Sequence, residues 1–195
     1  MNAVAIVGGG PSLAGTLDEI RELNAPVWVC NGAYPYLVEH GINPQAFVMV
    51  DRRKENAAFV RKPAPGCAHY LDKLCHPDVR RALKHHAVKE FDQYRLMAGG
   101  TVVSHAMLLA RQAGLTDQHF FGVDCCYMDG EGHAYPQPWQ KGERVEDIEI
   151  YGRKWRVAPW MLAQMADFNK IEAKFPDLKF TVHGNGLWAR SREEA

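Results

Sequence analysis

The chain has 195 residues, of which 47% are hydrophobic, and its 23 basic residues balance its 23 acidic residues. This length and apolar content predict one folded domain over residues 1–195 rather than a disordered segment. The zero net charge argues against binding to nucleic acid or to an anionic membrane, and no apolar run is long enough to cross a bilayer. Five cysteines, an odd number, and no recognisable signal peptide lead us to expect a reduced, cytoplasmic protein.

Short apolar runs alternate with amphipathic segments along the chain, which is typical of a mostly parallel sheet covered by helices. The predicted strands are Ala3–Val7, Val27–Cys30, Phe47–Val50, Ala68–Leu71, His86–Lys89, His119–Gly122 and Lys179–Val182. The predicted helices are Leu13–Leu23, Ala33–His40, Pro77–Leu83, Thr101–Ala113 and Pro159–Phe175. We therefore expect an α/β fold, with a single Rossmann-like domain built on this sheet.

The segment Asp147–Ala158 has a different pattern, in which apolar and charged residues alternate on both sides of Tyr151-Gly152-Arg153. Alternation of period two around a turn predicts a small hairpin, inserted before the last helix near the C-terminus. An exposed apolar face on this hairpin would favour a homo-oligomer.

The first predicted strand runs directly into a glycine loop, formed by Gly8, Gly9 and Gly10, which leads through Pro11 to Ser12. Glycines let the backbone approach a ligand closely, and N–H groups at the start of a helix attract anions. The loop therefore predicts a phosphate site, although a tight turn between strand and helix is the alternative. It lacks the third glycine of a dinucleotide fingerprint and the lysine of a P-loop.

Further candidate nucleotide-binding residues follow the second and third predicted strands and precede the helix predicted at Thr101–Ala113. Asn31 would bind ribose or base, or would simply cap the next helix. Asp51 would accept ribose hydroxyls or hold Mg²⁺, or would form an ion pair within Arg52–Lys54. Gly100 and Thr101 open a helix, as a second phosphate cradle or as an ordinary cap.

A second polar segment follows the strand predicted at His119–Gly122. It contains Asp124, Tyr127 and His133 in a glycine-bearing loop that could fold over a ligand. His133 is the candidate general acid or base, because imidazole exchanges protons near neutral pH. Asp124 and Tyr127 are expected to face the reacting centre with it, and Asp124 joins Asp51 as a candidate metal ligand.

These elements, in their order, resemble the MptE-like superfamily, which includes 6-hydroxymethylpterin diphosphokinases and motility-associated glycosyltransferases. The resemblance extends over roughly residues 3–135. It rests on Gly8–Leu13, Cys30-Asn31, Gly41–Pro44, Val50-Asp51, Gly99–Thr101, Gly122–Asp124 with Tyr127, and His133-Ala134. It implies a nucleotide-dependent transferase, which moves a diphosphoryl group from a nucleoside triphosphate or a glycosyl group from a nucleotide sugar to a small acceptor.

A more distant likeness is to bacterial sialyltransferases that use CMP-sialic acid. The chain departs from them at Gly9, Asp51 and His133, where they carry Asn, Asn and Tyr. The nucleotide would be of the ATP or the CMP/CDP type, and diphosphoryl transfer would require Mg²⁺. The alternative is a non-catalytic nucleotide-binding or assembly protein that keeps the fold.

Overall fold

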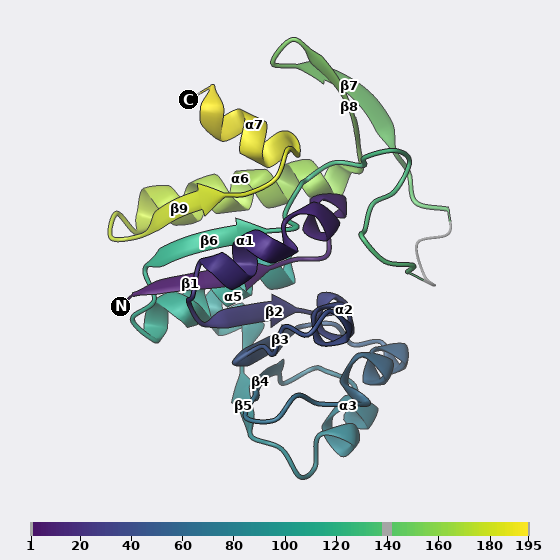
Figure 1. The fold of residues 1–195 in the computed structure, drawn as a ribbon, viewed down its shortest axis with the longest axis vertical. Helices are drawn as coiled ribbons and strands as arrows, with labels where there is room; N and C mark the ends of the chain where they lie inside the picture. The colour runs from purple at the N-terminus through teal and green to yellow at the C-terminus, as the bar shows by residue number, and fades with distance from the viewer. Residues whose placement is uncertain (1, 138–141, 195) are drawn as a thin grey trace.

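Seven strands form one parallel sheet, in the order β5-β4-β3-β2-β1-β6-β9, with helices packed on both faces (Figure 1). The computed structural model describes residues 2–137 and 142–194. The strands are β1 (Ala3–Val7), β2 (Val27–Cys30), β3 (Ala46–Met49), β4 (Ala68–Asp72), β5 (Val88–Phe91), β6 (Asp117–Phe121) and β9 (Lys179–Val182). The predicted α/β class and the parallel sheet are confirmed.

Helices and 3₁₀ turns cover the two faces of the sheet in separate groups. One face carries η1 (Pro11–Gly15), α1 (Leu17–Glu22), α2 (Ala33–Glu39), η2 (Lys54–Val60) and α3 (Pro77–Ala82). The other carries α5 (Val102–Gln112), α6 (Pro159–Lys174) and α7 (Leu187–Glu193). A short helix, α4 (Gln93–Leu96), follows β5 and contacts α5.

The central strands are apolar throughout because both of their faces are buried. In β1, Val4 and Ile6 point towards the α5 side, whereas Ala5 and Val7 point towards the α1 and α2 side. All four side chains are fully buried. This arrangement is expected for parallel strands covered by helices, and it explains why alternation of polar and apolar residues is absent there.

The predicted hairpin is also confirmed, as the antiparallel pair β7 (Glu146–Ile150) and β8 (Arg153–Val157), which projects from the body of the protein (Figure 1). Tyr151 and Gly152 connect the strands with φ angles of 56° and 65°. Positive φ at both central residues is the geometry of a two-residue type I′ turn, which matches the twist of the two strands.

Several local predictions differ from the structure. The helix predicted over Leu13–Leu23 is divided into η1 and α1 at Thr16, whose hydroxyl donates to the carbonyl of Ser12 at 3.2 Å. Such side-chain bonds to the backbone compete with continuation of a helix. Strand β5 lies two residues later than predicted, because its residues are mostly exposed at the sheet edge and give little apolar signal. The short helices α4 and α7 were not predicted.

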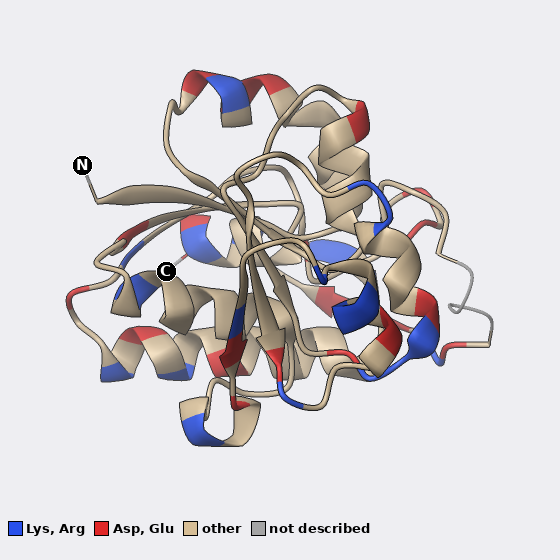
Figure 2. Ribbon diagram, turned by 90° about the horizontal axis from the view of Figure 1, so that it is seen from below, with Lys and Arg blue, Asp and Glu red and all other residues tan. Residues whose placement is uncertain are grey.

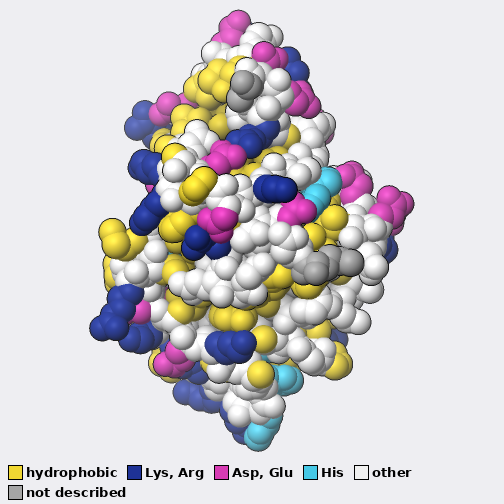
Figure 3. All heavy atoms as spheres, turned by 90° about the vertical axis from the view of Figure 1, so that its left-hand side faces the viewer, with side chains coloured by type: hydrophobic (Ala, Val, Ile, Leu, Met, Phe, Trp, Pro, Cys, Tyr) yellow, Lys and Arg dark blue, Asp and Glu magenta, His cyan; other side chains and the backbone are white. Residues whose placement is uncertain are grey.

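The surface carries charges of both signs without separating them. Basic and acidic residues are interspersed over the helices (Figure 2). They are also intermingled on the face at the left of Figure 1, where β1 begins (Figure 3). Within residues 2–137 and 142–194, no helix has both the length and the apolar character that a membrane crossing requires.

Candidate functional site

A cavity of about 910 Å³ lies beyond the carboxyl ends of the central strands. Here the strand order reverses, since β1 pairs with β2 on one side and with β6 on the other. Ligands of open parallel sheets bind at this position. Its wall includes Gly8, Gly9, Gly10, Cys30, Asn31, Asp51, Arg52, Arg53, Gln93, Gly100, Thr101, Val102, Val103, Asp124, Cys125, Cys126, His133, Tyr135, Gln137, Glu143, Trp160, Met161 and Gln164.

The glycine loop after β1 is pressed against the loop after β6. The N–H of Gly8 donates to the carbonyl of Phe121 at 2.9 Å, and the N–H of Gly10 donates to the carbonyl of Gly122 at 2.7 Å. A Cβ atom at Gly8 would lie 2.6 Å from the Gly122 oxygen, and one at Gly10 would lie 2.3 Å from the Asp124 carboxylate. The glycines are therefore required by this contact, whatever the cavity binds.

Asp124 occupies the start of η1 from inside the protein. Its Oδ2 accepts a 2.9 Å hydrogen bond from the N–H of Ser12. Burial raises the pKa of the Asp124 carboxyl, and the hydrogen bond from Ser12 lowers it. The sequence led us to expect that a bound phosphate would accept hydrogen bonds at the start of this helix. At the Ser12 N–H, the acceptor is instead the carboxylate of Asp124.

Ser12 was predicted to bind nucleotide, but its side chain faces away from the cavity. The Oγ atom lies against Gly184, where a Cβ atom would be 2.6 Å away, and Ser12 is not part of the described cavity wall. The Ser12 hydroxyl is buried without a hydrogen-bond partner among the described residues. Ser12 therefore acts on the Asp124 carboxylate, to which its backbone N–H donates, rather than on the cavity directly.

Asn31 and Asp51 both line the cavity, as predicted for residues that follow β2 and β3. The Oδ1 atom of Asn31 is buried and has no hydrogen-bond partner in the described part of the chain. An orphan acceptor of this kind is costly unless a ligand or water satisfies it. Asp51 accepts from the Arg53 N–H at 2.9 Å and lies 3.3 Å from its Nε, so the ion pair considered above is present.

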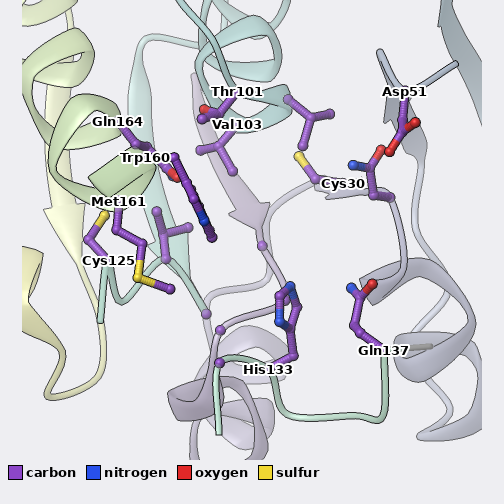
Figure 4. Close-up of a pocket in the computed structure, with 18 of the residues that line it drawn as sticks. Cys30, Asp51, Thr101, Val103, Cys125, His133, Gln137, Trp160, Met161 and Gln164 are labelled. Carbon is purple, nitrogen blue, oxygen red and sulfur yellow. The ribbon is translucent and has the colours of Figure 1, made fainter. Parts of the chain in front are cut away.

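The N-terminal end of α5 forms the opposite wall, where Thr101 and Val103 point into the cavity (Figure 4). The N–H of Gly100 donates to Asp167 of α6 at 3.1 Å, so one donor is already used. The first N–H groups of a helix have no acceptor within the helix. Those of Val102 and Val103 begin an eleven-residue helix at the cavity wall.

The loop after β6 brings His133 over the glycine loop, and the His133 ring points into the cavity (Figure 4). The N–H of Ala134 donates to the carbonyl of Gly9 at 3.0 Å. The hydroxyl of Tyr135 fills the space that a Cβ atom at Gly9 would occupy. Burial raises the pKa of Tyr135, so this phenol stays protonated and holds the loop rather than exchanging protons.

Tyr127 was predicted to face the reacting centre, but it lies behind the described cavity wall. Its hydroxyl donates to Glu143, a wall residue whose carboxylate also accepts from the indole N–H of Trp160. Burial and the Glu143 carboxylate both raise the pKa of Tyr127. Glu143, Trp160 and Gln164 were missed, because no sequence pattern shows that the start of α6 and the loop before β7 lie beside the ends of distant strands.

Asp51 and Asp124, the predicted metal ligands, are both on the wall, yet each is already engaged by the protein. No group of three or more His, Cys, Asp and Glu side chains in the described residues is arranged to hold a metal ion. Mg²⁺ commonly uses only one or two carboxylates and completes its shell with water and substrate phosphates. These two carboxylates fit that limited role, and not a metal site formed by the protein alone.

A parallel sheet with a cavity at its reversal of strand order defines an α/β protein of the doubly wound class, whose members bind ligands at this position. The chain belongs to the MptE-like family, described as 6-hydroxymethylpterin diphosphokinase MptE-like, which matches residues 1–130. No match was found among curated proteins.

One similar solved structure is that of the MAf glycosyltransferase from Magnetospirillum magneticum AMB-1, at a TM-score of 0.73 and 20% identity. The match covers 94% of this chain but only 32% of the glycosyltransferase chain. At this identity, the likeness supports the shared fold. The chain corresponds to about a third of the larger protein.

We expect Gly8→Ala to destabilise the fold by about 1–3 kcal/mol, because the new methyl group would meet backbone rather than a movable side chain. Gly15→Ala is the matched control, since a Cβ atom there would meet nothing within 4 Å. The control should be neutral or stabilising by about 0.4–1 kcal/mol. Urea unfolding measures both, and equal stability of the two variants would contradict the close contact between the loops.

We expect Asp124→Ala to cost about 1–3 kcal/mol, because it leaves the Ser12 N–H without an acceptor. Asp124→Asn should cost less, since its amide oxygen can still accept that bond. The raised pKa means that ionised Asp124 lowers stability above that pKa, and the asparagine removes this effect. Unfolding at pH 7 compares the variants, and equal losses would show that the charge holds the loop.

Proposed function

We propose that this protein binds a nucleotide in the cavity and transfers a group from it to a small acceptor. The observation that carries the proposal is the gathering of predicted binding residues from distant parts of the chain on one cavity wall. They are Gly8, Gly9, Gly10, Asn31, Asp51, Gly100 and Thr101, together with Asp124 and His133. The family description and the larger glycosyltransferase both name transferases, which supports this reaction class.

The phosphates would lie between the glycine loop and the start of α5. The α5 end is the better supported of the two, because N–H groups at the start of a helix attract anions and the η1 start is taken by Asp124. Asn31, with its orphan oxygen, and Asp51 would bind ribose or base.

His133 would move the proton of the reacting group. An imidazole can act as a general acid or base near neutral pH, and the His133 ring on the described wall points to the middle of the cavity. Asp124 would hold the glycine loop in place beside it, and Tyr127 would act by positioning Glu143.

The transferred group is either a diphosphoryl group or a glycosyl group. Diphosphoryl transfer from a nucleoside triphosphate agrees with the family description, and glycosyl transfer from a nucleotide sugar agrees with the likeness to the MAf glycosyltransferase. In the diphosphoryl case, Mg²⁺ would neutralise the triphosphate, and Asp51 and Asp124 are the carboxylates that would hold it.

A thermal-shift panel tests nucleotide binding directly, using CMP, CDP, CTP, AMP, ATP, GTP and UDP with and without Mg²⁺. A nucleotide at 100 times its Kd stabilises the fold by about 2.7 kcal/mol, which shifts the melting temperature visibly. A shift with ATP that requires Mg²⁺ would favour diphosphoryl transfer, and a cytidine-selective shift without metal would favour glycosyl transfer. If none of these ligands shifts the transition, the proposal is wrong.

We expect His133→Ala to lower turnover about 10²–10⁴-fold while nucleotide affinity is largely retained, as for loss of a general acid or base. His85→Ala is the control, because His85 is exposed and lies outside the described cavity wall. Single-turnover kinetics with the nucleotide found in the panel measures the effect. Wild-type turnover in the His133 variant would remove this histidine from the mechanism.

A further inference from the structure

The two ends of the cavity differ in chemistry. One end holds both cationic wall residues, Arg52 and Arg53, together with Asp51. The other end is formed by Trp160 and Gln164 of α6 with Glu143, and no Lys or Arg lines it among the described residues. Figure 4 shows the α6 side chains on one side of His133 and Asp51 on the other.

We propose that the α6 end is the acceptor subsite and that Glu143 binds the acceptor there. This inference rests on the proposed transferase function and deepens it. The ligand class is an uncharged ring compound that carries N–H or O–H donors.

The charge of Glu143 determines which of the two substrates, nucleotide or acceptor, this end of the cavity can bind. The Glu143 carboxylate repels the phosphates of a nucleotide, and among the described residues the cations that line the cavity are Arg52 and Arg53 at the other end, so the phosphates favour the α5 start and that end. An uncharged molecule with a hydrogen-bond donor is instead attracted, because bonds to an ionised acceptor are the stronger ones.

Glu143 is held in position by two other segments of the chain. The Tyr127 hydroxyl, from the loop after β6, donates to its Oε2, and the Trp160 indole N–H donates to its Oε1. A carboxylate has about four acceptor sites, so two such bonds leave capacity for a ligand. This places a fixed acceptor at the wall before any ligand binds.

Trp160 adds a flat apolar surface beside that acceptor. Its side chain remains 41% exposed although it lies on the cavity wall. Figure 4 shows the indole beside Met161 and below Gln164. The bond to Glu143 fixes the orientation of the indole plane, and an exposed aromatic face next to polar groups favours a ring that can stack on it. The amide of Gln164 supplies both a donor and an acceptor on the same wall.

A neutral heteroaromatic compound and a neutral sugar are both uncharged ring compounds that carry N–H or O–H donors. The test therefore measures binding of two probes separately by isothermal titration, 6-hydroxymethylpterin and N-acetylglucosamine. Each probe is titrated into the wild type, into Glu143→Gln and into Glu146→Gln. Glu143→Gln keeps the size and one acceptor oxygen, which can still accept from the Trp160 indole, but removes the charge. Glu146 is a nearby exposed carboxylate of β7 outside the described wall.

We expect at least one probe to bind the wild type and Glu146→Gln equally, and to bind Glu143→Gln about tenfold more weakly. Trp160→Phe keeps a flat ring but removes the indole N–H, so it should weaken the same probe less. Nucleotide affinity, measured in all four proteins by thermal shift, should stay the same.

The inference is overturned if neither probe binds the wild type, or if the bound probe has equal affinity for the wild type and Glu143→Gln. It is also overturned if Glu143→Gln weakens the nucleotide instead of the probe. Nucleotide binding without probe binding removes the acceptor subsite and leaves the proposed function intact. Absence of nucleotide binding removes the proposed function as well.

Discussion

The rest of the site depends on one backbone contact, in which the loops that follow β1 and β6 meet without side chains between them. The glycines at positions 8 and 122 permit this approach, and a methyl group on either would meet a carbonyl oxygen of the other. Because β1 and β6 are neighbours at the reversal of strand order, the contact fixes where the sheet ends and the cavity begins. It then orients Asp124 towards η1 and brings His133 across the opening.

The sheet could be predicted from the sequence because the central strands are short apolar runs between glycine and polar residues. The prediction fails where burial is weak or local bonds compete. The edge strand β5 is largely exposed, and the Thr16 hydroxyl interrupts the first helix. Helix α7 is only seven residues long, and it is stabilised by burial of Trp188 against the sheet rather than by its own sequence pattern.

Most of the candidate site could be predicted for one geometric reason, since residues that follow parallel strands meet at the same edge. Asn31, Asp51 and Asp124 are found on the cavity wall for that reason. The positions of Ser12 and Tyr127 could not be predicted, because each depends on which partner its polar groups find in space. The Asp124 carboxylate accepts a hydrogen bond from the Ser12 N–H, and the Glu143 carboxylate accepts one from the Tyr127 hydroxyl.

The position of α7 has a consequence for the order in which the chain folds. The N–H of Trp188 donates to the carbonyl of Asp124, and Gly184 and Gly186 pack against the Ser12 and Asp124 side chains. Asp124, a residue of the cavity wall, is therefore supported by segments near both ends of the chain. Contacts of such sequence separation close the largest loops and form late. During synthesis, the first five strands can pair before α7 is available, so the Asp124 loop gains its contact with α7 after the central sheet has formed.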